Sequence, residues 1–333
     1  MPTYRKLLIL ALLLAVAGTG AFLLYRRAAA APEAARLLPE GDRLAYINLK
    51  PVRLFWDLGK SKPVELEGSY RDFVNQTGIQ FERDLDEVAA SWQEARATRG
   101  RDVESAAIFT GRFDSAKLSA YLKRISSQAE TYRGLTIYTI PNQDHNVRVC
   151  VLDASRIATS TRNSADAIHG IIDRLHGSAD GPWLLQTYYR KVPATSLAWM
   201  IDRIRAGSGM QEQTFIPSFS FLDNTIAVGS LRYNGSLLVR ADVFAVSDAD
   251  AKRVFDSMNT FLALSGFLGR SAGMRDDADV KAALNSIRVE QKGNIVTITG
   301  ECSEKLLKKI QNEMKAESNA APAPAANPQR EGR

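Results

Sequence analysis

The chain has 333 residues, with 43 Lys and Arg against 37 Asp and Glu and a formal net charge of +6. Residues 1–27 hold four of the basic residues and none of the acidic ones, which leaves 39 basic against 37 acidic residues in the remainder. Because the excess positive charge belongs mostly to one terminal segment, and no stripe of Lys and Arg interleaved with aromatics follows it, the composition argues against a nucleic-acid partner.

The N-terminal segment has the length and composition of a membrane span. Arg5-Lys6 and Arg26-Arg27 flank the 19 apolar or small residues Leu7–Tyr25, which as a helix would be about 28 Å long, close to the hydrocarbon thickness of a bilayer. A cleavable signal ending near Ala15–Ala17 is the alternative. The apolar run resumes at Phe22–Tyr25 after this small-residue patch, so we predict an uncleaved anchor spanning residues 7–25.

The side of the membrane follows less directly from the sequence. Both flanks of the span carry two basic residues, so the positive-inside rule gives only a slight preference, through the N-terminal amine, for a cytoplasmic N-terminus. We therefore predict a single-pass protein of the inner (cytoplasmic) membrane with most of the chain in the periplasm, and keep a cytoplasm-facing domain as the alternative. Cys150 and Cys302 lie far apart in sequence, and buried free thiols are the simplest expectation, with their pairing left open.

The remaining chain divides by composition. Residues 28–40 are rich in Ala and contain two prolines, which predicts a short linker. Residues 318–333 form a Pro/Ala tail without apolar periodicity, which predicts disorder. Between them we place a first half at residues 41–192 and a second half at residues 193–317, each alternating strand and helix patterns.

The first half contains strand patterns of alternating or continuous apolar residues and helix patterns of 3.6-residue period. The expected strands are Arg43–Leu49, Ser105–Thr110, Leu135–Ile140, Val147–Leu152 and Arg156–Ser160, and the expected helices are Glu65–Gln76, Asp84–Arg96, Ser115–Ala129 and Ser164–His176.

The second half uses the same patterns. Asn234-Gly235 between two β-rich runs is a strong hairpin signal, because a type I′ turn needs positive φ at both positions. The expected strands are Ser196–Ile201, Asn224–Tyr233, Ser236–Val246, Ser286–Gln291 and Ile295–Thr299, and the expected helices are Ala249–Leu264, Asp277–Leu284 and Ser303–Lys315.

A strand, an oxygen-bearing cap and an amphipathic helix recur four times along the chain. This repetition predicts an α+β fold in which antiparallel sheets carry helices packed on one face. It also suggests two duplicated α/β sandwich halves related by a duplication about Pro193. The alternative is that caps after strands are common in any α+β protein.

Four segments carry a resemblance to known proteins. LLPEGDRLAYINLKPVR, YRDFVNQTGIQFERDLDEVA, AIFTGRFDSAKL and YRGLTIYTIP together resemble a family of uncharacterised bacterial envelope proteins with one N-terminal span and a domain of unknown function. The resemblance covers roughly residues 37–200, and TGIQFERDLDEV is its most distinctive part. It implies a single-span protein that displays an α+β module, and it transfers no activity.

Candidate catalytic and metal-binding residues are few. His169, Asp173 and His176 share one strip of a predicted helix, a spacing that could present three metal ligands, although histidines at the edge of an apolar helix face are commoner. Gly269–Gly273 matches G-x-S-x-G, but a helix precedes it and no histidine follows His176, which excludes a hydrolase elbow and favours a Gly/Ser loop. We expect no metal and no cofactor.

Two acidic clusters could support hydrolysis without histidine. Each lies at the start of a predicted helix, where the helix dipole favours acidic residues, so a solvated surface is the simpler interpretation. The first cluster is Glu82, Asp84, Asp86 and Glu87, and the second is Asp276, Asp277 and Asp279.

Two aromatic clusters are the best candidates for a binding surface, since exposed aromatic groups mark interfaces. Ordinary core packing is the alternative for both. The cluster residues are Trp183, Leu184, Tyr188 and Tyr189 in one segment and Phe215, Phe219 and Phe221 in another.

These observations favour a membrane-anchored envelope protein whose α+β module acts by binding or scaffolding. The expected partners are the membrane, through residues 7–25, and either another envelope protein or an apolar ligand. The alternatives are an envelope hydrolase that uses carboxylates and a cytoplasm-facing interaction protein. Between binding and catalysis, catalysis is less favoured because the sequence contains no specific catalytic motif.

Overall fold

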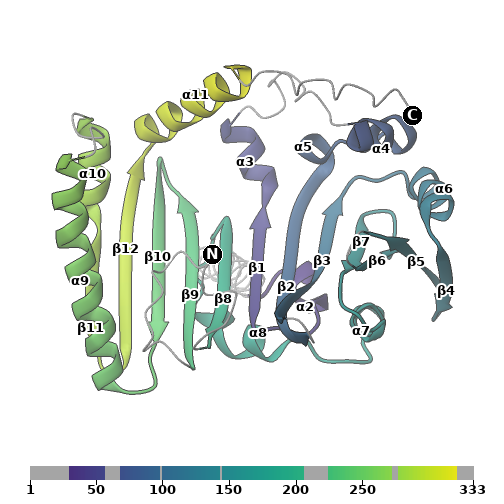
Figure 1. Cartoon of the computed structure of the whole chain (residues 1–333), viewed down its shortest axis with the longest axis horizontal. Helices are drawn as coiled ribbons and strands as arrows, with labels where there is room; N and C mark the ends of the chain where they lie inside the picture. The colour runs from purple at the N-terminus through teal and green to yellow at the C-terminus, as the bar shows by residue number, and fades with distance from the viewer. Residues whose placement is uncertain are drawn as a thin grey trace, which may run out of the picture.

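A computed structural model describes residues 30–56, 68–97, 100–142, 145–205, 224–271 and 277–320. The predicted span 7–25, most of the predicted tail and the residues Phe215, Phe219 and Phe221 lie outside this part of the chain. Within the described residues, no helix combines the length and the apolar character needed to cross a membrane. The described residues form an α+β fold built on one large antiparallel sheet, as predicted for the class (Figure 1).

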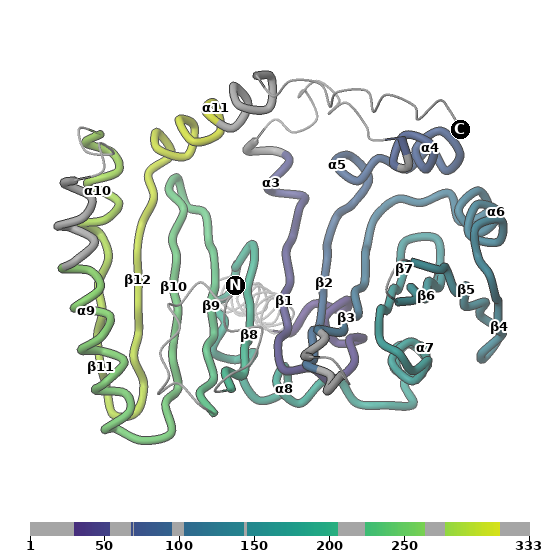
Figure 2. Tube along the Cα trace, viewed as in Figure 1, coloured from purple at the N-terminus to yellow at the C-terminus, as the bar shows by residue number. Residues whose placement is uncertain are grey.

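The sheet contains twelve strands in the order β11-β12-β10-β9-β8-β1-β2-β3-β7-β6-β5-β4, and Figure 2 traces the chain through them. Every neighbouring pair is antiparallel. The bounds are β1 Arg43–Asn48, β2 Leu85–Ala97, β3 Gly100–Gly111, β4 Gln128–Tyr132, β5 Leu135–Pro141, β6 Asn146–Val151, β7 Arg156–Ser160, β8 Ala198–Ile204, β9 Thr225–Tyr233, β10 Ser236–Phe244, β11 Arg288–Lys292 and β12 Ile295–Ser303.

The helices connect these strands and cover parts of the sheet. Their bounds are α2 Glu33–Leu37, α3 Leu49–Trp56, α4 Gly68–Thr77, α5 Phe81–Asp84, α6 Ser115–Ile125, α7 Asp166–Leu175, α8 Trp183–Tyr188, η2 Tyr189–Lys191, α9 Asp248–Ser271, α10 Ala278–Ser286 and α11 Glu304–Ala320. Two of them change the predicted boundaries. Helix α2 lies inside the predicted linker 28–40, with Ala35 and Leu37 buried in the core, and α11 extends three residues into the predicted tail.

The main core lies on one face of the sheet, which we call the closed face. Side chains at alternate positions of the central strands, such as Leu44, Ile108 and Ile201, are fully buried there. The same cluster contains Ala35 of α2, Ile168 of α7 and residues of α8, so these three helices cover the closed face.

The opposite face, which we call the open face, is covered at its two ends. Near β10 and β12, Val254 of α9 packs with Val243 and Val296 in one buried cluster. Near β5 and β6, Leu118 of α6 packs with Val149 in another. Helices therefore cover both faces of one sheet, and the prediction of helices on one face was wrong. The reason is that the strands carry apolar side chains on both faces, while the prediction allowed them one buried face.

The segment predicted as the helix Asp84–Arg96 is the strand β2. It pairs with β1 on one edge and with β3 on the other. Leu85, Val88, Ala89 and Trp92 stand at helical spacing, but Ala89 faces the main core while Val88 and Trp92 face the other side. A central strand that carries apolar side chains on both faces loses the period-2 alternation that identifies a strand, so its apolar spacing imitated that of a helix.

The hairpin at Asn234-Gly235 is confirmed by the pairing of β9 with β10. Tyr233 pairs with Leu237, which leaves three residues in the loop. Gly235 has a positive φ of 76°, whereas Asn234 is not among the positive-φ residues. The expected type I′ turn was therefore wrong, because a three-residue loop needs its left-handed residue at one position only.

Candidate functional site: an apolar valley on the open face

The centre of the open face carries a row of four alanines, one glycine and one methionine that crosses six neighbouring strands. The row follows the register from β10 through β9, β8, β1 and β2 to β3, in which each residue is the cross-strand partner of the next. With about 4.8 Å between strands, the row is about 24 Å long. It consists of Ala241, Gly229, Met200, Ala45, Ala90 and Ala107, and we call it the valley floor.

Two further rows border the floor, two residues along each strand on either side. One row, the apolar bank, contains Val239, Leu231, Ala198, Ile47, Val88 and Phe109. The other row, the charged bank, contains Val243, Ala227, Asp202, Arg43, Trp92 and Ser105. The floor and the two banks together form a mostly apolar strip across six strands, which we call the valley, and Met200 is the one large side chain of its floor.

The valley is more accessible than the closed face opposite. All six floor residues are partly exposed, and Val239 of the apolar bank is 42% exposed. A Cβ added at Gly229 would meet no atom within 4 Å, so there is open space above this part of the floor. Within the described residues, none of the three buried clusters includes a floor residue.

A buried ion pair lies in the middle of the charged bank. The Nη2 of Arg43 on β1 donates to Oδ2 of Asp202 on β8 at 2.8 Å, and the two side chains are 7% and 3% exposed. Burial raises the pKa of Asp202, and the hydrogen bond and charge of Arg43 oppose that effect. The pair fixes the register of β1 against β8 at the centre of the sheet.

The aromatic surface predicted around α8 divides between core and solvent. Leu184 is 1% exposed, and Tyr188 and Tyr189 pack against the main core. Trp183 is 45% exposed, and the guanidinium carbon of Arg203 lies 5.0 Å from the centre of its indole ring. The structure does not bring these residues to the valley, because α8 covers the closed face.

Trp183 instead lines a pocket of about 270 Å³ at the end of β1, β2 and β8. Its backbone N–H donates to Oε1 of Glu40 at 2.8 Å. Asp42, which is buried, pairs with Arg205 at 2.8 Å. The other lining residues are Gly41, Gln93, Leu184 and Arg203.

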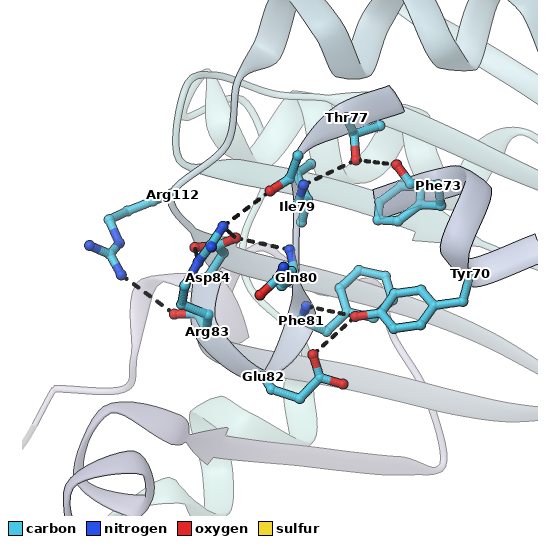
Figure 3. Close-up of polar contacts among 11 residues, drawn as sticks. Tyr70, Phe73, Thr77, Ile79, Gln80, Phe81, Glu82, Arg83, Asp84 and Arg112 are labelled. Carbon is cyan, nitrogen blue, oxygen red and sulfur yellow. Dashed lines mark hydrogen bonds and ion pairs between the residues drawn. The ribbon is translucent and has the colours of Figure 1, made fainter. Parts of the chain in front are cut away.

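The distinctive TGIQFERD segment forms a network of internal hydrogen bonds (Figure 3). Thr77 Oγ1 donates to the carbonyl of Phe73 and accepts from the N–H of Ile79. Asp84 accepts from the N–H of Gln80 at 2.9 Å and from two guanidinium nitrogens of Arg83 at 2.8 Å. Burial alone raises the pKa of Asp84, but these hydrogen bonds outweigh it and hold that pKa below the usual value.

This network positions α4 and α5 against the end of β3. Tyr70 of α4 accepts from the N–H of Phe81 and donates to Glu82, both at 3.0 Å. A Cβ added at Gly111 of β3 would lie 2.2 Å from the carbonyl oxygen of Asp84, so only glycine permits this close approach. The segment therefore has a structural role in closing one end of the open face.

The predicted histidine strip is occupied by other contacts. His169 bonds to Glu130 at 3.0 Å and stacks on Tyr132 at 4.1 Å. Asp173 accepts from the Tyr132 hydroxyl at 3.1 Å and from Arg133 at 2.8 Å. Within the described residues, no group of three or more potential metal ligands is close enough to hold an ion.

The acidic clusters are also engaged in pairs. Asp86 contacts Lys50 at 3.3 Å and also Arg53, Asp277 pairs with Lys309, and Asp279 pairs with Lys305 at 2.9 Å. Asp276 lies outside the described residues. Two described pockets, at Trp183 and beside α6, contain none of the predicted acids.

The two cysteines are free thiols on strands far apart in the sheet. Cys150 of β6 is buried in the main core, and this burial raises the pKa of its thiol to about 12. A thiol with so high a pKa stays protonated and unreactive at neutral pH.

No family model matches the chain, and no curated protein matches it. Three solved structures, crystal forms III, IV and I of TP0453, are similar to it at 12%, 12% and 10% sequence identity. They cover 85%, 84% and 86% of this chain and 99%, 97% and 98% of their own, each with a TM-score of 0.45. A likeness at this level supports no inference about fold or function.

Proposed function

We propose that the protein is a single-span envelope protein of the inner membrane whose α+β module binds an apolar ligand along the valley. The anchor, Leu7–Tyr25, and the periplasmic side rest on the sequence: 19 apolar or small residues between basic flanks and a short N-terminal tail. The observation that carries the binding proposal is the partly exposed row of apolar residues, five of them Ala or Gly, across six strands.

The chemistry of the valley favours a hydrocarbon chain as its occupant. The floor side chains offer no hydrogen-bond donors or acceptors, and the six central strands are paired on both edges, so no strand can be added there. The floor is about 24 Å long, which exceeds the depth of one leaflet in a bilayer whose hydrocarbon core is about 30 Å thick. Since one acyl chain fills the depth of one leaflet, the floor is long enough to hold a whole acyl chain.

Burial of the valley also gives the driving force. Covering apolar surface is worth about 25 cal/mol for each Å² removed from water. The floor and the apolar bank together present eleven apolar side chains and one glycine. None of these side chains needs a hydrogen-bond partner from the ligand. Binding of this kind selects shape and apolarity rather than a particular functional group.

Filling the floor tests this proposal. In the full-length protein, we expect Gly229→Val and Ala45→Leu to abolish binding of a naphthalene sulfonate dye that palmitate displaces from the unmodified protein. A Cβ added at Gly229 meets no atom within 4 Å, so a side chain there has room to extend into the valley. The matched control is Ala129→Leu, which adds the same group at an exposed position of β4.

The outcomes separate the alternatives. Loss of palmitate-displaceable dye in both floor variants, with binding retained in the control, supports the proposal. Unchanged displacement in the floor variants would overturn it. If instead palmitate never displaces the dye and the floor variants lose a co-purifying envelope protein, the partner is a protein segment and the hydrocarbon proposal fails.

The proposal includes an internal duplication about Pro193, with halves at residues 41–192 and 193–317. Strand order supports it: outward from the centre, one side reads β1, β2, β3 and β7, and the other reads β8, β9, β10 and β12. A helix follows the third strand on each side, α6 after β3 and α9 after β10. The valley then crosses the three inner strands of each half.

A further inference from the structure

Trp183 of α8 lies at one end of the central strands, close to the point where the described chain begins. Residue Ala30 leads directly into α2, and α2 contacts β1, β2, β3 and α7. A Cβ added at Gly181, two residues before Trp183, would lie 3.2 Å from the carbonyl oxygen of Arg36 in α2. Figure 1 shows α2 and α8 at the same end of the strands, which we call the basal edge.

The distance from the predicted span to this edge is short. Five residue steps separate Tyr25 from Ala30, and an extended chain covers at most about 3.6 Å per residue. The start of the described domain therefore lies within about 18 Å of the membrane boundary if residues 7–25 span the bilayer.

The basal edge has the side chains that membrane interfaces favour. Trp183 is 45% exposed, and indole rings concentrate at the level of lipid headgroups. Arg203 lies against this ring, Arg205 is 44% exposed at its side chain, and Arg36 of α2 is exposed. Guanidinium groups bind lipid phosphates through paired hydrogen bonds.

We propose that the basal edge docks on the surface of the membrane in which the chain is anchored, with Trp183 at headgroup depth and Arg36, Arg203 and Arg205 contacting lipid phosphates. This inference rests on the proposed membrane span and adds an orientation to it: the strands stand with the basal edge toward the bilayer. Arg205 can contact a phosphate while it remains paired with Asp42, because a guanidinium has five donors.

Tryptophan quenching in proteoliposomes tests the orientation with the full-length chain. Vesicles contain phosphatidylglycerol and phosphatidylcholine brominated near the headgroup end of the acyl chains. We expect these lipids to quench the emission of the unmodified protein, and Trp183→Phe to remove the larger part of that quenching.

A relocated tryptophan provides the matched control. Phe261 of α9 is 47% exposed, close to the value for Trp183, and it lies thirteen residues after the start of α9, about 20 Å along the helix. Phe261→Trp in the Trp183→Phe background is expected to restore emission without restoring the quenching. Equal quenching of Trp183 and of the tryptophan at position 261 would overturn the proposed orientation.

The lipid headgroup provides a second readout. We expect stronger quenching with phosphatidylglycerol than with phosphatidylcholine alone, and Arg203→Gln to reduce this difference while Arg203→Lys largely keeps it. If the headgroup makes no difference in any variant, the arginine contacts are excluded.

The membrane span is checked separately by extracting the proteoliposomes with alkaline carbonate. A chain that stays with the vesicles but shows no quenching of Trp183 keeps the anchor and overturns the docking. A chain that is released overturns the anchor, and the docking inference fails with it.

Discussion

The two faces of the central strands differ although they are built from alternate residues of the same segments. On β3, Ala106 and Ile108 are buried at 1% and 0% exposure on the closed face, whereas Ala107 and Phe109 are partly exposed on the open face. Three helices cover the closed face, and the described helices cover the open face mainly at its ends. The comparison shows that apolar residues on both faces of a strand do not imply two equivalent cores.

The largest expected loss of stability concerns the buried ion pair Arg43–Asp202 in the charged bank of the open face. Asp202→Asn leaves Arg43 buried without its carboxylate, and we expect it to lower the free energy of unfolding by about 3–5 kcal/mol, measured by urea denaturation. Asp256→Asn is the control, because Asp256 forms an exposed pair with Lys252, which contributes at most about 1 kcal/mol. Equal losses in both variants would show that the charged bank is solvated.

Adjacent residues of β3 compare the two faces directly. Ile108→Ala is expected to cost about 2–5 kcal/mol, because it leaves a cavity in the main core. Phe109→Ala removes a larger side chain but is expected to cost only about 1 kcal/mol, because that ring is partly exposed in the absence of ligand. Denaturation midpoints measure both, and a loss for Phe109→Ala as large as that for Ile108→Ala would contradict an open valley.

The network that closes one end of the open face is expected to depend on pH. Asp84 has its pKa lowered in the folded protein, so it stabilises the fold above its unfolded value, near pH 3.8, and this contribution is lost as the pH falls through the lower folded pKa. Asp84→Asn should cost about 1–3 kcal/mol at pH 7.

The pH profile itself distinguishes a specific role from general destabilisation. In Asp84→Asn, the decrease in unfolding free energy as the pH falls below 3.8 should be smaller than in the unmodified protein. Asp72→Asn, at an exposed position of α4, is the control and should keep the original profile. If Asp84→Asn shows the same decrease in unfolding free energy at low pH as the unmodified protein, Asp84 is not the cause of that decrease.

The smallest expected effect comes from enlarging an alanine on the open face. Ala90→Leu extends into the valley and should change the free energy of unfolding by no more than about 0.5 kcal/mol. Ala158→Leu makes the same change at a position with 0% exposure on the closed face and should cost about 1–3 kcal/mol through overpacking. Thermal unfolding of the two variants side by side measures the contrast, which disappears if the valley is filled.

Most elements could be predicted because their signals are local. The strand Arg156–Ser160 matches β7 in both bounds, and Asp114 caps α6 as expected, with its side chain accepting from the N–H of Lys117. The strand β4, Gln128–Tyr132, was missed because four of its five residues are exposed and polar or small, which leaves no apolar pattern. Its position is decided by pairing with β5.

The candidate site was less predictable than the elements. Trp183 was singled out because an aromatic residue beside Gly181-Pro182 is a local signal, but it lines the pocket at Glu40 and Asp42 and does not lie in the valley. The valley floor was not singled out, because Ala45, Ala90 and Met200 come from three distant segments and are unremarkable in each of them. Only the register of the sheet places them in one row. A row of small residues across strands has no sequence period that a single chain could reveal.

The sequence by itself determined the α+β class, most strands and helices, and the free cysteines as the simplest expectation, because each depends on neighbouring residues and their spacing. The anchor at residues 7–25 stays a prediction. Only the tertiary structure decided that β2 is a strand, that helices cover both faces and that four alanines, a glycine and a methionine meet across six strands. The physical reason is that hydrogen-bond pairing between distant segments, and the burial it brings, outweighs the weak local preference of any one segment.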